Sequence, residues 1–240
     1  MDGTKYDTHH SHNVFGLLRT ARTVVSPPVE KKHIVDNPGG SGNIDLSTSL
    51  TGVPLYHNRT ITEKFIIPFV KNKSEKILSK IYQILDGQLT RIVFDSEPEY
   101  YWLGKPMVSD VDKSNETHMR LNIVSDVQPY KYERYSSIED WEWDSLNFET
   151  GIIRDYRDIY VDGYLEFEII GTKMPVSPVF RTSEVMQDML VEYYDPLFDR
   201  TVEASLLDTA TPDIIIREGA QKLKFTGTGY VTIEYRGGIL

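Results

Sequence analysis

The stretch Val35-Asp36-Asn37-Pro38-Gly39-Gly40-Ser41-Gly42-Asn43-Ile44-Asp45-Leu46 has two short pieces of β-strand character on either side of a glycine-rich run. Glycine, proline and asparagine in such a run are typical of a turn that joins two strands. The other interpretation is a phosphate-binding loop. The run lacks the Gly-Lys-Ser/Thr ending of such a loop, and no helical pattern follows it. We therefore interpret residues 37–43 as a turn between strands.

One segment downstream has the pattern of an amphipathic helix. Five apolar residues recur there at the spacing of one helix face: Ile77, Leu78, Ile81, Ile84 and Leu85. Ser74 has the side chain of a helix N-cap, and Gly87 follows the last apolar residue, where a glycine ends a helix at little cost. The sequence predicts a helix at about residues 74–86 whose apolar face covers a sheet.

The rest of the chain is mostly of β character. Residues 119–127 alternate apolar and polar side chains, as a half-buried strand does. Asp162-Gly163 has the composition of a hairpin turn. Other strands are predicted at residues 60–66, 91–94, 100–104, 160–161, 164–170, 189–193, 214–216, 222–225 and 230–235.

A domain boundary is expected near Gln128-Pro129-Tyr130, because proline ends the preceding pattern and the following polar segment has no clean period. Residues 1–130 then form an N-terminal β-sandwich or sheet with one covering helix, an α+β arrangement. Residues 131–240 form a C-terminal antiparallel β-sandwich, since several short strands with turns at regular spacing are typical of that architecture. The predicted fold class is mainly β.

Composition excludes several classes of protein. The 240 residues include no cysteine, so disulfides and thiolate metal sites are excluded. No apolar run approaches the ~20 residues of a membrane span, and no secretory signal is readable at the N-terminus. The net charge of −10 argues against a protein that coats nucleic-acid phosphates. We expect no membrane association and no tight nucleic-acid binding.

His9, His10 and His12 are the first candidates for a chemical site, as metal ligands. Their spacing is too short for the usual pattern of zinc ligands, and no cysteine lies near them. We interpret them as solvent-facing or interface residues, and expect no metal and no cofactor. The chain also lacks a Gly-x-Ser-x-Gly elbow and a cysteine nucleophile, so we predict no catalytic residues and no enzyme activity.

Trp141 and Trp143 alternate with acidic residues in the stretch that contains Glu139, Asp140, Glu142 and Asp144. Paired carboxylates beside aromatic rings are typical of a glycosidase cleft. Period two, however, places both tryptophans on one face of a strand and the acids on the other, which separates the rings from the carboxylates. We favour a strand with one aromatic face. Trp141 and Trp143 remain candidate glycan-binding or interface residues.

An ordered series of short motifs resembles the distal tail (Dit) proteins of long-tailed siphophages. Besides the opening stretch, it consists of Phe15-Gly16-Leu17-Leu18, Ser26-Pro27-Pro28, Leu50-Thr51-Gly52, Tyr56-His57-Asn58-Arg59-Thr60, Trp141-Glu142-Trp143-Asp144, Pro175-Val176-Ser177-Pro178 and the C-terminal segment 219–240. The last of these looks like the final hairpin of a galectin-like sandwich. The resemblance spans nearly the whole chain.

This resemblance implies a structural virion protein, made in the bacterial host cytoplasm and located in the phage tail. The N-terminal domain would form a homo-hexameric ring, and the galectin-like domain would carry other proteins. The ring would link the tail tube to the tail tip and its receptor-binding proteins, and would let DNA pass through its channel. The alternative hypothesis is a carbohydrate-binding β-sandwich that recognises host cell-wall glycans.

Overall fold

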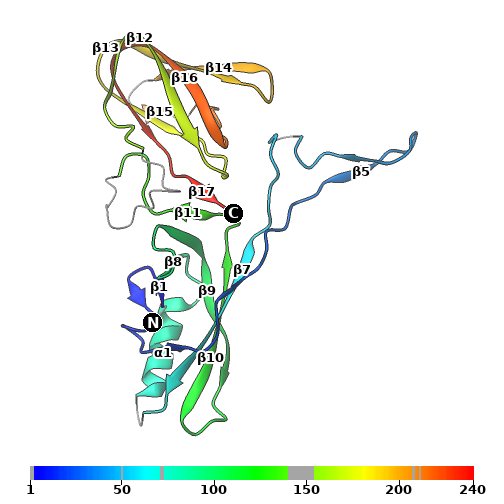
Figure 1. Ribbon diagram of the computed structural model, residues 1–240, viewed down its shortest axis with the longest axis vertical. Helices are drawn as coiled ribbons and strands as arrows, with labels where there is room; N and C mark the ends of the chain where they lie inside the picture. The colour runs from blue at the N-terminus through cyan, green and yellow to red at the C-terminus, as the bar shows by residue number, and fades with distance from the viewer. Residues whose placement is uncertain (1–2, 50, 71–72, 140–153, 207–208, 211) are drawn as a thin grey trace. The chain divides into compact units, whose positions relative to one another are not determined.

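A computed structural model describes residues 3–49, 51–70, 73–139, 154–206, 209–210 and 212–240. The chain divides into two compact units, Met1–Lys131 and Tyr132–Leu240. Both are built mainly of antiparallel strands (Figure 1), which confirms the predicted mainly-β class. In the described ranges, no helix combines the length and the apolar character needed to cross a bilayer.

The first unit is built on one antiparallel sheet. Its strands are β1 (Thr4–Tyr6), β2 (His9–His10), β3 (Leu18–Arg19), β4 (Val24–Val25), β7 (Arg59–Pro68), β8 (Thr90–Phe94), β9 (Tyr100–Asp112) and β10 (His118–Val127). They lie in the order β2-β1-β8-β9-β10-β7-β3, and β4 also pairs with β7. Burial alternates strictly along β7, because period two sends every second side chain into the core.

Side-chain contacts show that this sheet curls around its core. The hydroxyl of Tyr6 on β1 donates to a carboxylate oxygen of Glu63 on β7 at 2.5 Å. Three other strands separate β1 from β7 in the sheet order. Their side chains therefore meet only because the two ends of the sheet face each other across the interior.

Helix α1 (Ser74–Leu85) confirms the predicted helix and its apolar face. Three residues of that face are buried in the core of the sheet, and two more pack against it: Leu78, Ile81 and Leu85, then Ile77 and Ile84. The predicted capping role of Ser74 is wrong. The helix N-cap is Lys73, so the Ser74 hydroxyl lies in the first turn. It accepts from Val70 N at 2.8 Å and donates to Pro68 O at 2.9 Å, which ties down the preceding loop.

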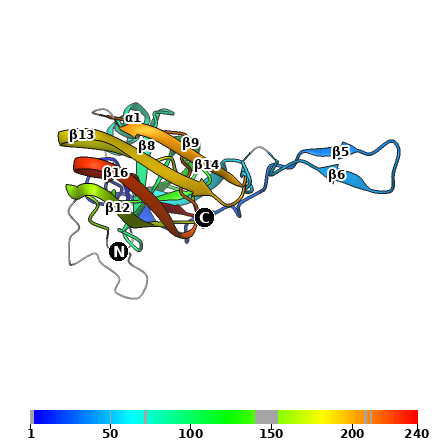
Figure 2. The same cartoon turned by 90° about the horizontal axis from the view of Figure 1, so that it is seen from above.

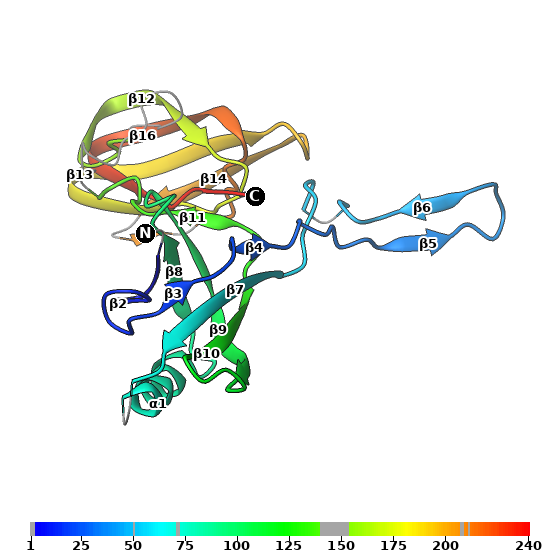
Figure 3. The same ribbon diagram turned by 60° about the horizontal axis from the view of Figure 1, so that its bottom comes forward.

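Between β4 and β7 the chain leaves the sheet as a long hairpin. Its tip is a separate two-stranded ladder of β5 (Ile34–Asp36) and β6 (Asn43–Asp45). Figures 1, 2 and 3 all show β5 and β6 extending away from the rest of the first unit. The turn predicted at residues 37–43 joins these two strands, which confirms that interpretation. We call residues 27–58 the arm.

The second unit contains a five-stranded antiparallel sheet in the order β12-β16-β13-β14, with β15 beside β13. The strands are β12 (Ile159–Gly171), β13 (Val179–Asp195), β14 (Arg200–Leu206), β15 (Thr209–Ala210) and β16 (Gly219–Glu234). β11 (Lys131–Glu133), which contains the division between the units, pairs with β17 (Gly238–Ile239). Apolar residues of the inner face form one buried cluster, in which the rings of Phe180 and Phe225 are 6.0 Å apart.

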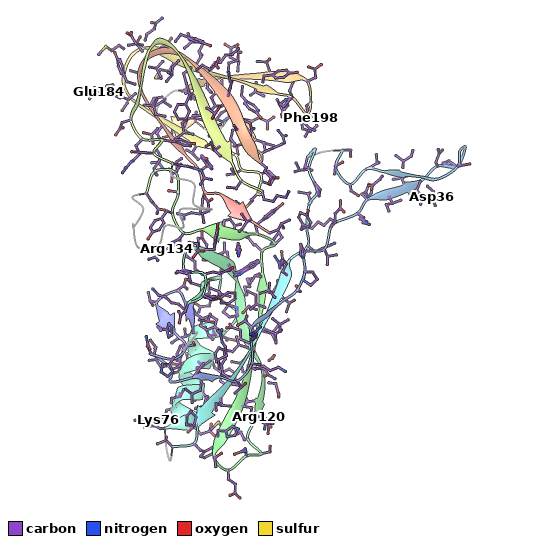
Figure 4. The ribbon with its side chains drawn as sticks, in the orientation of Figure 1. Asp36, Lys76, Arg120, Arg134, Glu184 and Phe198 are labelled. Atoms are coloured by element: carbon purple, nitrogen blue, oxygen red, sulfur yellow. The ribbon has the colours of Figure 1, made fainter. Side chains whose placement is uncertain are left out.

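Two predicted turns of this unit are wrong. Asp162-Gly163 lies inside β12, and the predicted last hairpin is one continuous strand, β16. Gly163 pairs with Gly227 across these two strands. Next to them, the register of β13 shifts after Ser183, and Glu184, labelled in Figure 4, has a φ of 49°. The glycines therefore mark a sharp bend in paired strands.

Gly227 shows why a glycine is required at this bend. Its φ is +129°, and a Cβ built there would lie 2.5 Å from the backbone oxygen of Asp188. Any other side chain would clash with the neighbouring strand. A turn and a bend within a strand both require glycine. The local sequence pattern therefore does not distinguish a turn from a bent strand.

Candidate assembly surface

The arm is held together by backbone hydrogen bonds along its length. From base to tip the bonds are Ser26 N to Thr60 O, His57 N to Val29 O, Lys31 N to Leu55 O and Leu46 N to His33 O, all between 2.7 and 2.9 Å. The two chain segments therefore run side by side from the sheet to the turn. Asp36, labelled in Figure 4, lies at the far end of β5.

Apolar side chains of the arm are exposed to solvent. Six of them are between 38% and 58% exposed: Val29, Ile34, Val35, Ile44, Leu46 and Leu55. Every residue of β5 and β6 is exposed, so neither face of this ladder is covered. An isolated two-stranded hairpin is marginally stable in water. Apolar side chains gathered on an exposed element make this arm a candidate interaction surface.

The base of the arm is fixed to the sheet through Arg59. Its Nε donates to the backbone oxygen of Ser26 at 2.7 Å. Its guanidinium lies over the ring of Trp102, 4.8 Å from the centroid. Burial lowers the pKa of Arg59 from its ordinary value, but the group stays far above neutral pH. Arg59 thus holds both segments of the arm where they leave the sheet.

A buried carboxylate lies further along the same strand. Glu63 accepts hydrogen bonds from Thr4, Tyr6 and Arg19, the last at 2.8 Å. Its side chain is fully enclosed. Burial raises the pKa of Glu63, and the hydrogen bonds and the nearby Arg19 only partly oppose that effect. The cluster links β1, β3 and β7 across the interior, so its role is to hold the curled sheet together.

The sequence analysis did not identify Arg59 or Glu63, although the pattern of β7 contains a signal for buried charge. The inward positions of β7 are Arg59, Ile61, Glu63, Phe65 and Ile67, so charged residues interrupt an apolar series. Such an interruption indicates a buried polar group that needs partners. The partners themselves lie about 40 to 60 residues away, as the separations of 59 for Thr4 and 44 for Arg19 show. No local pattern links them.

The histidines considered as metal ligands have separate surroundings. His10 Nε2 lies 3.0 Å from a carboxylate oxygen of Asp95. The ring of His9 stacks on Phe15, and His12 Nδ1 lies 3.3 Å from Leu17 O. In the part of the chain that the structure describes, no three histidine or acidic side chains gather into a metal-binding group.

Trp141 and Trp143 lie outside the described residues, so their candidate role stays a prediction. The surface that the structure does describe offers apolar side chains and paired backbone on an exposed arm. These groups suit contact with another protein chain. They supply no arrangement of acid, base and nucleophile around a cleft.

The sequence matches no protein-family model, and no curated protein matches it significantly. Among solved structures, the chain is similar to the crystal structure of the SPP1 Dit (gp 19.1) protein, described as a paradigm of hub adsorption apparatus in phages that infect Gram-positive bacteria. The match covers 100% of both chains, with a TM-score of 0.58 and 11% sequence identity. This chain therefore has the fold of the SPP1 Dit protein, as the sequence resemblance predicted.

Proposed function

We propose that this chain is a structural component of a phage tail adsorption apparatus, a distal tail hub that assembles into a homo-hexameric ring. The observation that carries the proposal is the shared fold with SPP1 Dit over the whole of both chains. The ring links the tail tube to the tail tip and its receptor-binding proteins. The protein is thus a part of the virion and not an enzyme.

The arm supports assignment of the ring contacts to the first unit. It exposes apolar side chains, and its base is tied to the sheet by Arg59. A second copy of the chain supplies the surface that covers these side chains. In a closed ring every copy both gives and receives such a contact, and no arm is left exposed.

Fragments of the chain test this assignment. Residues 1–130 should still oligomerise, and residues 131–240 should stay monomeric. The measurement is the mass in solution by light scattering, with negative-stain electron microscopy of the full chain to show ring and symmetry. A monomeric full chain at high micromolar concentration contradicts the ring. Oligomers of residues 131–240 alone contradict the assignment to the first unit.

The ring channel carries a second expectation. DNA that passes through must not be held, and a basic channel would hold it by releasing counterions. The net charge of −10 per chain is compatible with a neutral or negative channel. We expect no binding of duplex DNA by the assembled ring at about 50 mM salt, where electrostatic binding is strong. Salt-sensitive retention of DNA in a filter or mobility assay contradicts this expectation.

A further inference from the structure

Within the part of the chain that the structure describes, β12 pairs only with β16 and is therefore the last strand at one end of the sheet of the second unit. It runs for 13 residues, which is long for an edge strand. Natural proteins usually shorten such an edge, place charged side chains along it, or block it with proline or with a bulge. β12 contains no proline, and its register with β16 is continuous from Ile159 to Gly171. The edge is therefore available along much of its length.

One end of this edge is closed by side chains. The hydroxyl of Tyr156 lies 3.3 Å from the backbone nitrogen of Ile170 and accepts from it. The hydroxyl of Tyr235 donates to the backbone oxygen of Ile170 at 2.6 Å. Ile170 thus points its backbone groups away from β16. Along an antiparallel strand, the backbone N–H and C=O groups of successive residues point alternately toward and away from the neighbouring strand. The backbone groups of Tyr164, Glu166 and Glu168 therefore also point away from β16.

These three residues differ from Ile170 in one respect. Among the described residues, no group satisfies their outward N–H and C=O. Gly163, with a φ of +75°, bends the strand just before them. The regular open edge therefore runs from Tyr164 to Glu168, and we call these five residues the β12 edge.

The side chains of the β12 edge specify what pairs with it. On the outer face lie the carboxylates of Glu166 and Glu168, and Glu166 accepts from Lys222 at 2.5 Å. On the inner face, Leu165 and Phe167 are only partly buried against the core. An added strand therefore gains from basic side chains on one face and apolar side chains on the other. A second copy of β12 would place carboxylates opposite carboxylates, which is unfavourable.

We propose that the β12 edge binds an extended segment of a partner protein, in which basic and apolar residues alternate, as an added strand of the sheet. Backbone hydrogen bonds to Tyr164, Glu166 and Glu168 hold the segment, and the alternating side chains select it. This site does not rest on the proposed ring contacts, because it lies within the second unit and those contacts are assigned to the first.

The probe is a capped peptide of alternating lysine and valine, added to the full-length chain. Amide hydrogen exchange by NMR reports which backbone groups become protected. At saturation, the amides of Tyr164, Glu166 and Glu168 should exchange at least about tenfold more slowly, as amides in a ladder do. A matched peptide of alternating glutamate and valine should bind far more weakly. Unchanged exchange at these amides, or equal binding of both peptides, overturns the proposal.

Two substitutions at Glu166 separate backbone pairing from charge. Glu166→Ala and Glu166→Pro both remove the carboxylate, and only the proline also removes the outward N–H. The proline variant should bind the lysine peptide about tenfold more weakly than the alanine variant, the loss typical of one backbone hydrogen bond. Equal affinities of the two variants overturn the proposal. If the proline variant fails to melt cooperatively, Glu168→Gln serves instead. This variant should bind the lysine peptide more weakly than the wild type does. Its affinity for the glutamate peptide should be unchanged or higher.

Discussion

The sheet of the first unit and its arm are made of similar strands with opposite environments. In β7, every second side chain is buried, and Ile61, Phe65 and Ile67 are almost completely enclosed. In β5 and β6, every residue is exposed, and Ile34 and Ile44 lie in solvent although they are as apolar as those of β7. Both regions pair their backbone in antiparallel ladders.

The difference shows that pairing of the backbone and burial of side chains are separate contributions. A ladder satisfies N–H and C=O groups, but its net gain over water is small. Burial of apolar surface supplies the larger stabilisation, about 25 cal/mol per Å². The sheet has both contributions within one copy of the chain. The arm has only the first, which is why we propose that a second copy of the chain covers its apolar side chains.

The largest change in the free energy of unfolding is expected for a substitution in the core of the sheet. Phe65→Ala removes a buried ring and leaves a cavity, and should lower the free energy of unfolding by about 3–5 kcal/mol. Urea denaturation followed by circular dichroism measures the loss. A change below about 1 kcal/mol would show that the core relaxes around the cavity and that Phe65 is not tightly packed in it.

The second prediction is that the contribution of Glu63 to the free energy of unfolding depends on pH. Because burial raises the pKa of Glu63 in the folded state, folding favours the protonated form. The contribution of Glu63 to stability is therefore present below its unfolded pKa and is lost as pH rises through the folded pKa. For a single proton the slope is at most about 1.4 kcal/mol per pH unit.

Glu63→Gln is the matched variant for this effect, because it keeps the shape and cannot ionise. Relative to the wild type, it should become less destabilising as pH rises from about 4 to 7, by the linkage given above. Urea denaturation of both proteins across this range measures the difference. A difference that grows with pH would mean that Arg19 stabilises the carboxylate more than burial opposes it.

The smallest effect on folding is expected in the arm. Ile44→Ser removes an apolar side chain that is 48% exposed, and should change the unfolding of the single chain by less than about 0.5 kcal/mol. The same variant should weaken self-association, because it removes apolar surface from the proposed contact. Denaturation at low concentration and sedimentation at high concentration measure the two quantities. Weaker folding with unchanged association would place Ile44 in the core of its own chain.

The sequence by itself predicted those elements whose structure depends on residues close together in the chain. The face of α1 followed from five apolar residues at helical spacing, and the turn at residues 37–43 followed from its glycines and asparagines. Alternation identified β10. In each case the physical cause lies within one turn or one strand, because side-chain direction repeats with the local backbone.

Only the tertiary structure decided features that depend on distant residues. Gly163 and Gly227 resemble turn residues, but they face each other in a bent ladder, and their pairing joins positions far apart in the chain. Glu63 meets Tyr6 of β1 because the sheet curls, and it meets Arg19 because β3 pairs with β7. The exposure of Ile44 follows from the departure of the arm from the sheet. Sequence spacing carries no record of such contacts, because chain folding brings these residues together irrespective of their separation.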